Sequence, residues 1–251
     1  MTPPHSPPPR PPILAAGGWG LGPHSWSGWA DRCAAQGWTF SALDRGYFPP
    51  AATPGILESD PDLASPAPPA PIILFTHSYG LHTCPLHLWS AATALVIFSG
   101  FSHFHPSEPR PSRRRLQRMI QQFQHYPAAV LQQFWHNTAA PHPWQPHWAP
   151  NLDDLTHWHC DRLTQDLQAL DQSHLDPTPL VSLSQILILH GTADAIVPLT
   201  QGQALAALLT QETQAKVTFQ PISAAGHALP LSHAPHCWYH LHPWLTQLQP
   251  S

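Results

Sequence analysis

Three residues of this chain, a serine, an aspartate and a histidine, have the order and surroundings that nucleophilic catalysis requires. Ser78 lies in the pentapeptide 76–80 (Thr-His-Ser-Tyr-Gly), directly after the apolar run 71–75. The apolar run predicts a buried parallel strand. The pentapeptide predicts a nucleophile elbow, a sharp turn from strand to helix that holds the serine hydroxyl above the sheet. We therefore expect Ser78 to be a nucleophile.

A serine nucleophile needs a base to accept its proton and an acid to orient that base. Asp194 follows the strand-like run 186–190, and His227 lies in the loop after the last predicted strand, 217–222. Each of the three residues thus follows a different predicted strand, at the edge of the sheet where ligands bind in open α/β folds. The sequence predicts a catalytic triad of Ser78, Asp194 and His227.

Each member of this triad also has a simpler interpretation. Asp194 alone could be a turn residue or a helix cap. The chain has 20 histidines, and His77, His233 and His236 are competing candidates close to the expected site. None of these three occupies the first loop after the final predicted strand, so the joint pattern favours His227.

Acyl transfer also needs two backbone N–H groups directed at the developing oxyanion. In a nucleophile elbow one of them belongs to the residue after the serine, here Tyr79. The other is expected from the glycine-rich loop 16–21 after the first predicted strand, where Trp19 is the candidate donor. The alternative is that this loop is an ordinary glycine turn.

The rest of the chain supplies the elements that would position these residues. Apolar runs alternate with helical patterns, which indicates a mostly parallel sheet flanked by helices. The predicted strands are 13–16, 38–43, 72–76, 95–98, 186–190 and 217–222, with helices at 197–209 and 234–248. We expect a flexible, Pro-rich N-terminus at residues 1–12 and an α/β core formed by residues 13–100 and 181–251.

The interval 101–180 contains no strand pattern and predicts a helical cap, or lid. Leu116, Met119, Ile120 and Phe123 form one apolar stripe at helical spacing. A second helix is expected to begin at Pro127, and a third is expected to run from an Asn151 cap to Leu170. A cap in this position would exclude water and shape a substrate pocket.

Composition limits the class of protein. Charged residues make up only 10% of the 251 residues and the formal net charge is −4, which gives no signal for nucleic acid. No apolar run reaches the roughly 18 residues that a membrane span needs. The N-terminus has prolines where an export signal needs an apolar core, so we predict a cytoplasmic protein with reduced cysteines.

Two clusters invite further interpretation. The pairs His103/His105 and His157/His159 lack a second pair at zinc-finger spacing, so no metal is expected. Five of the nine arginines gather at the start of the predicted cap: Arg110, Arg113, Arg114, Arg115 and Arg118. Such a run can be a solvated helix face, or a basic patch for an acidic or phosphorylated partner.

Several of these segments together resemble the α/β-hydrolase superfamily, and most of all the pimeloyl-[acyl-carrier protein] methyl ester esterases of biotin synthesis. The segments are 18–21 (Gly-Trp-Gly-Leu) with Trp26, the elbow 76–80, 191–198, and 226–233. Three features depart from the pattern of that family. The chain has Gly17 where a histidine is usual and Thr76 where a glycine is usual, and the Pro-rich stretch 49–71 replaces a helix. The departures affect the expected substrate more than the expected reaction.

The resemblance implies a triad of Ser78, Asp194 and His227, and oxyanion donors at Trp19 and Tyr79. It implies hydrolysis of the methyl ester of pimeloyl carried on acyl-carrier protein, with cap arginines that bind the acidic carrier and with no cofactor. A general small-molecule carboxylesterase, or a related lyase without a carrier protein, is the alternative enzyme. A non-catalytic hydrolase-like binding module is the alternative from another class.

Overall fold

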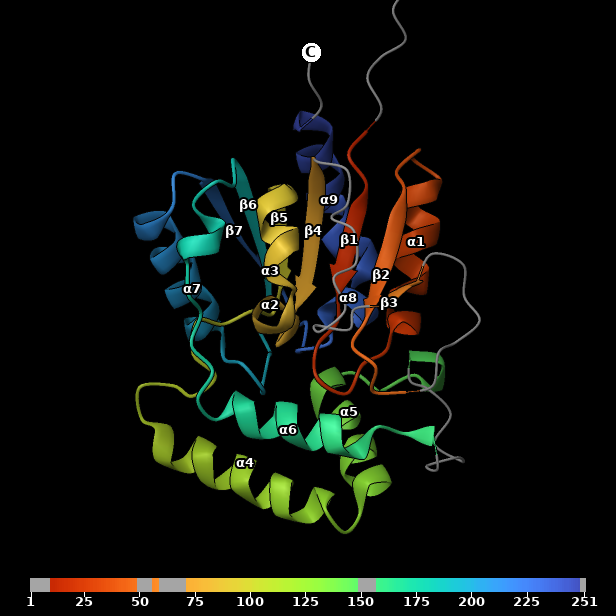
Figure 1. Cartoon of the computed structure of the whole chain (residues 1–251), viewed down its shortest axis with the longest axis vertical. Coiled ribbons are helices and arrows are strands. Elements are labelled where there is room, and N and C mark those ends of the chain that lie inside the picture. The colour runs from red at the N-terminus through yellow and green to blue at the C-terminus, as the bar shows by residue number, and fades with distance from the viewer. Residues whose placement is uncertain (1–9, 49–55, 59–70, 149–156, 249–251) are drawn as a thin grey trace, which may run out of the picture.

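The computed structural model describes residues 10–48, 56–58, 71–148 and 157–248, and it builds them around one seven-stranded sheet (Figure 1). The strand order is β3-β2-β1-β4-β5-β6-β7, and every described pairing is parallel. The strands are β1 (Ile13–Ala16), β2 (Phe40–Asp44), β3 (Ile56–Glu58), β4 (Ile72–His77), β5 (Ala92–Phe98), β6 (Gln185–Gly191) and β7 (Lys216–Ile222). The strands β3 and β7 form the two edges.

The predicted strands are present, with small shifts of their ends. The strand expected at 38–43 begins at Phe40, and Trp38 instead packs into the core before the strand starts. The prediction missed β3, because it treated 49–71 as one long connection. Three residues between proline-rich segments are too few for a periodic pattern to be visible. The rest of that stretch lies outside the described residues.

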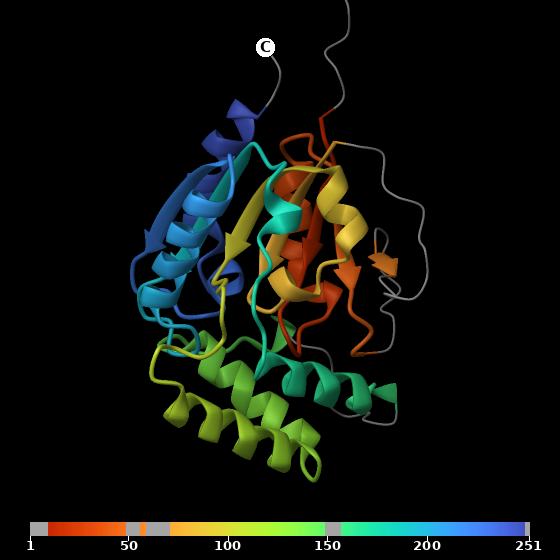
Figure 2. The same cartoon turned by 60° about the vertical axis from the view of Figure 1, so that its left-hand side comes forward.

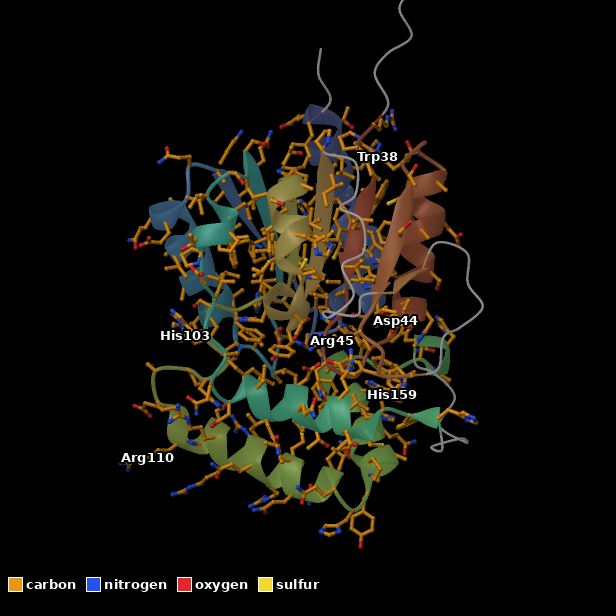
Figure 3. All side chains as sticks on the ribbon, viewed as in Figure 1. Trp38, Asp44, Arg45, His103, Arg110 and His159 are labelled. Carbon is orange, nitrogen blue, oxygen red and sulfur yellow. The ribbon has the colours of Figure 1, made fainter. Side chains whose placement is uncertain are left out.

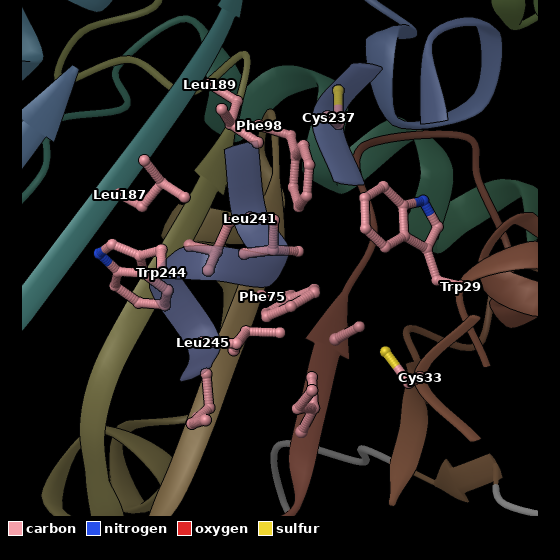
Figure 4. Packing of buried hydrophobic residues seen from close by; sticks show 14 of the residues in the cluster. Trp29, Cys33, Phe75, Phe98, Leu187, Leu189, Cys237, Leu241, Trp244 and Leu245 are labelled. Atoms are coloured by element: carbon pink, nitrogen blue, oxygen red, sulfur yellow. The ribbon is translucent and has the colours of Figure 1, made fainter. Parts of the chain in front are cut away.

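Helices cover both faces of the sheet. The helices α1 (Ser27–Ala34) and α9 (Ala234–Gln247) lie on one face, where Trp29 packs against Phe75 and Phe98 (Figure 4). On the other face lie α2 (Gly80–Thr83), α3 (Leu86–Ala91) and α7 (Leu199–Glu212) (Figure 2). Burying both faces explains why β4 is apolar at successive positions and does not alternate.

Three helices lie beyond the carboxyl ends of the strands, and we call them the cap helices (Figure 1). They are α4 (Pro109–Phe123), α5 (Pro127–Ala139) and α6 (Cys160–Leu170). The apolar stripe of the first predicted helix lies in α4, and α5 begins at Pro127 as the sequence predicts. The third begins at Cys160, and its expected Asn151 cap lies outside the described residues. The remaining elements are α8 (Leu229–Ser232) and the short 3-10 turns η1 (Pro23–Trp26), η2 (Pro146–Trp148) and η4 (Thr178–Leu180).

A buried ionic cluster fastens α6 to the loop after β2. The Asp166 carboxylate accepts hydrogen bonds from Arg45 Nε at 2.8 Å, from Arg45 Nη2 at 2.6 Å and from the Tyr47 hydroxyl at 2.6 Å. Figure 3 labels Arg45 between the sheet and α6. Burial, and next the charge of Asp166, raise the pKa of the Tyr47 phenol, so it remains a donor at neutral pH. The cluster ties a cap helix to the core.

In the described part of the chain, no helix is both long enough and apolar enough to cross a membrane. Residues 1–9 of the predicted flexible N-terminus lie outside the described residues. Arg10, by contrast, is described, and its guanidinium carbon lies 5.0 Å from the centroid of the Trp38 ring.

Replacing Asp166 with Ala should leave Arg45 and Tyr47 without their shared acceptor. Removing one partner of a buried ion pair costs about 3 kcal/mol, and we expect the free energy of unfolding to fall by about that amount. Urea titration followed by circular dichroism measures it. The control is Asp161→Ala, at an exposed site in the first turn of the same helix, where a loss of no more than about 1 kcal/mol is expected. Equal losses in the two variants would contradict the role given to the cluster.

Candidate active site

Ser78 lies on a sharp turn directly after β4. Its φ of 54° is in the left-handed region that side chains rarely adopt, and its N–H donates to Phe98 O at 2.9 Å. Gly80 explains how the turn fits, because a Cβ there would lie 2.5 Å from Ala16 O and 2.7 Å from Gly17 O. The strand, the strained serine and the crowded glycine together form the geometry of a nucleophile elbow.

Thr76 stands where the elbow pattern usually has its first glycine, and the structure explains why a side chain is tolerated. Thr76 belongs to β4, where it pairs with Ala16 and Ile97. Its side chain is buried, with Oγ1 3.5 Å from Val96 O, and the turn begins only after His77. The residue therefore needs no special backbone conformation.

The structure brings together the three residues that the sequence singles out. His227 Nε2 lies 2.8 Å from Ser78 Oγ, and His227 Nδ1 lies 2.8 Å from Asp194 Oδ2. A carboxylate only accepts hydrogen bonds, so Nδ1 carries the proton and the bare Nε2 faces the serine hydroxyl. All three residues are buried, His227 with only 1% exposed. Such an arrangement can move a proton from Ser78 to His227.

The turn after β6 holds the Asp194 carboxylate in place. The N–H groups of Ile196 and Val197 donate to Asp194 Oδ1 at 2.9 and 2.8 Å, which leaves Oδ2 for His227. Burial alone would raise the pKa of Asp194, but the charge and hydrogen bond of His227 outweigh burial and the pKa is lowered. Asp194 therefore stays ionised and orients the imidazole.

The competing histidines of the sequence divide into two groups. His233 and His236 lie near each other, with ring centroids 5.8 Å apart, and neither contacts Ser78 or Asp194 within the described residues. His77 does belong to the site, because its Nε2 lies 3.0 Å from His227 O. His190, which the sequence shows only as the end of a strand, lies 3.5 Å from Asp194. A histidine on an otherwise apolar buried strand was the signal for both.

The loop after β1 lies against the elbow and extends between the cap helices. The Trp19 indole N–H donates to Leu163 O of α6 at 2.8 Å, while the Trp135 indole N–H of α5 donates to Gly20 O at 2.9 Å. Within the described residues, the backbone N–H groups of Trp19 and Tyr79 donate to no protein acceptor. Both predicted oxyanion donors are therefore free to bind a ligand oxygen.

A groove of about 680 Å³ runs between α4 and α5 and reaches the loop directly after Asp194. Its lining is mostly apolar and includes Leu116, Met119, Val130, Phe134 and Ile196. Phe134 also packs against the Trp19 ring, with centroids 5.0 Å apart. The groove thus shares a wall with the loop of the predicted oxyanion donors.

The structure divides the predicted arginine cluster of α4. Arg115 and Arg118 line the groove, whereas Arg113 lies 3.6 Å from Asp171 and lines a separate cavity of about 560 Å³ beside α7. Arg110 and Arg114 are exposed, and Figure 3 shows Arg110 directed away from the protein at the start of α4. The five side chains therefore do not form one patch.

The predicted histidine pairs do not combine into a metal site. In the parts of the chain that the structure covers, no group of three or more His, Cys, Asp or Glu side chains is arranged to hold a metal ion. His103 instead contacts His174, with ring nitrogens 2.5 Å apart, and His105 contacts Asp171 at 2.9 Å.

Acid should destabilise this protein through histidines that the fold shields from water in their neutral form. Burial lowers the pKa of His77 from 6.5 to about 3, and that of His82 from 6.5 to about 4. Below pH 6.5 these two histidines take up protons in the unfolded chain but stay neutral in the folded protein. The free energy of unfolding therefore falls as pH falls. The slope approaches about 1.4 kcal/mol per pH unit for each histidine.

Urea titrations between pH 4.5 and 6.5 measure this slope. The variant His82→Leu should reduce the slope by the contribution of one histidine. An unchanged slope in that variant would show that His82 does not keep its neutral form on folding.

No protein-family model and no curated protein matches the chain, but many solved structures do. Three of these structures illustrate the match.

 The esterase from Exiguobacterium antarcticum superposes with a TM-score of 0.71 at 16% identity, covering 94% of this chain and 92% of that one. The malate-bound esterase from Thermogutta terrifontis superposes with a TM-score of 0.65 at 18% identity, covering 96% of this chain and 91% of that one. The bromoperoxidase from Bacillus anthracis superposes with a TM-score of 0.66 at 19% identity, covering 94% of this chain and 92% of that one. This chain is similar to each of them in fold, and the predicted α/β-hydrolase fold is confirmed.

Proposed function

We propose that this chain is a serine hydrolase that cleaves carboxylic esters through an acyl-enzyme. One observation carries the proposal: a continuous hydrogen-bonded chain from Ser78 through His227 to Asp194, with both contacts at 2.8 Å. The left-handed backbone of Ser78 adds to it, because strain of this kind is maintained where function needs it. The solved esterases of the same fold agree with this reaction class.

In the proposed mechanism, Ser78 Oγ attacks the ester carbonyl carbon while His227 Nε2 accepts the hydroxyl proton. Asp194 stabilises the imidazolium that forms and holds its Nδ1–H in one orientation. The tetrahedral intermediate then collapses, and His227 returns the proton to the leaving alcohol. Water, activated by the same imidazole, hydrolyses the acyl-enzyme and regenerates Ser78. The reaction needs no cofactor.

The backbone N–H groups of Trp19 and Tyr79 are the proposed donors to the oxyanion. Hydrogen bonds directed at developing charge in a dry site are worth more than the same bonds in water. The site is largely shielded from solvent, because the cap helices cover it and Ser78 is only 8% exposed. A substrate would reach it along the groove between α4 and α5.

For the substrate we propose the methyl ester of pimeloyl carried on acyl-carrier protein, as the resemblance of the motifs implies. The mostly apolar groove suits an acyl chain, and Arg115 and Arg118 at its wall supply positive charge. The exposed Arg110 and Arg114 would face an acidic carrier. This role would place the protein in the cytoplasm, where biotin synthesis needs it.

Two alternatives lead to different measurements. A general small-molecule carboxylesterase, or a related lyase of the same fold, would act without a carrier protein. A non-catalytic binding module would keep the fold but would not react with a fluorophosphonate probe. Growth of a biotin-requiring strain that lacks its own pimeloyl esterase, once it carries this chain, would favour the biotin role over both.

Replacing Ser78 with Ala should abolish hydrolysis of a short p-nitrophenyl ester, because the nucleophile is lost. We expect kcat to fall by about 10⁴-fold or more. The same variant should lose labelling by the fluorophosphonate probe while its circular dichroism is unchanged. The control is Ser90→Ala, at an exposed serine of α3. Retained activity in Ser78→Ala would refute the mechanism.

Reversing the charge of Arg110 and Arg114 together should weaken use of a carrier-bound substrate. For the Arg110→Glu/Arg114→Glu variant we expect kcat/KM on pimeloyl-carrier methyl ester to fall about tenfold, an effect that salt should reduce. Hydrolysis of a free small ester should not change, since neither residue lines the groove. The Lys/Lys variant keeps both charges and is the control. Equal losses on both substrates would count against the carrier.

A further inference from the structure

Two buried histidines lie beside the triad, and the mechanism above does not use them. His77 is the last residue of β4, and His190 lies one residue before the end of β6. His77 is 2% exposed and His190 is fully buried. The His77 ring lies 5.2 Å from the His227 ring, and His190 Nε2 lies 3.5 Å from Asp194 Oδ2.

Both histidines make the same kind of contact. His77 Nε2 lies 3.0 Å from His227 O, and His190 Nε2 lies 2.9 Å from Val197 O. A backbone carbonyl only accepts hydrogen bonds, so each Nε2 must carry a proton and donate it. Each imidazole thus ties the end of a strand to the backbone of a neighbouring loop.

The two carbonyls belong to the loops that carry the partners of Ser78. One is the carbonyl of His227 itself. The other belongs to Val197, whose own N–H donates to Asp194 Oδ1 at 2.8 Å. Val197 therefore links His190 to the carboxylate: its carbonyl is held by the imidazole, and its N–H holds Asp194.

Packing alone does not account for the imidazole at position 190. His190 Nδ1 is buried and has no hydrogen-bond partner within the described residues. Gly202 of α7 packs against it so closely that a Cβ there would lie 2.3 Å from Nδ1. Burying a polar atom without a partner costs free energy, so an apolar side chain would suit this cavity better. What only the imidazole provides is the donor at Nε2.

The environment keeps both histidines in the form that this contact needs. Burial is the largest cause that lowers the pKa of each, and for His77 the pKa falls to about 3. Both are therefore neutral at neutral pH, with one proton on the donor nitrogen. A second charged imidazole next to His227 would oppose the imidazolium that forms during catalysis.

We propose that His77 and His190 are positioning residues that fix the His227 loop and the Asp194 loop to the ends of β4 and β6. They hold the base and the acid at hydrogen-bonding distance from Ser78 and from each other without touching the substrate. The proposal rests on the proposed hydrolase function.

The test replaces each histidine with leucine, which removes the donor, and with glutamine, whose amide nitrogen can reach the position of Nε2. His82→Leu is the matched control. His82 is a partly buried histidine whose Nε2 lies 3.0 Å from a carbonyl, that of Phe101, and this carbonyl is on the loop after β5, which carries no triad residue. Kinetics on a p-nitrophenyl ester and urea unfolding are measured for all five variants.

We expect kcat to fall about tenfold or more in His77→Leu and His190→Leu, since small displacements of catalytic groups have effects of this size. KM should change less than twofold, and each glutamine variant should recover most of the kcat. His82→Leu should keep the wild-type kcat. If a leucine variant does not fold, the glutamine variant and the control still decide, because a positioning role requires near wild-type kcat in the glutamine variant.

Wild-type kcat in the folded leucine variants, or the same loss of kcat in His82→Leu, would overturn the proposal. So would a low kcat in a folded glutamine variant. Failure of the hydrolase function is a separate result, because the wild-type protein would then neither hydrolyse the ester nor react with the fluorophosphonate probe.

Discussion

The position of the loop after β1 depends on two tryptophans that bind across the boundary between core and cap. Trp19 reaches from the loop to α6, and Trp135 reaches from α5 back to Gly20. Through these two hydrogen bonds the cap helices help to hold the loop in place. The loop includes the backbone N–H of Trp19, which is a proposed oxyanion donor. The cap is thus part of the proposed site as well as its cover, and the groove between α4 and α5 is the proposed route for the substrate.

The chain is poor in charge, and it concentrates hydrogen bonds on its buried carboxylates. Asp166 and Asp194 are the buried acidic residues in the described part of the chain. Each accepts three hydrogen bonds shorter than 3 Å, the first from Arg45 and Tyr47, the second from the 196–197 turn and His227. One carboxylate joins the cap to the core, and the other orients the base. Satisfying every acceptor in this way lets a charge remain buried.

The sequence predicted what depends on local pattern. Apolar runs located the long strands, and the order of Ser78, Asp194 and His227 on strand ends was enough to predict that they meet. The edge strand at Ile56–Glu58 was too short to be recognised. The sequence favoured His227 over His77 by its place in the loop after the last strand, and it could not show that His77 is buried beside the triad. The division of the α4 arginines depends on Asp171, which is distant in sequence.

The edge strand β7 has a consequence for solubility. An exposed parallel edge offers unpaired backbone groups to any neighbouring chain, and it is a common start of aggregation. Within β7, Pro221 has no N–H to offer, and Lys216 places the only lysine of the chain at the beginning of the strand. A proline and a charge are the features by which sheet proteins discourage strand addition. This edge is therefore protected against extending the sheet into a second molecule.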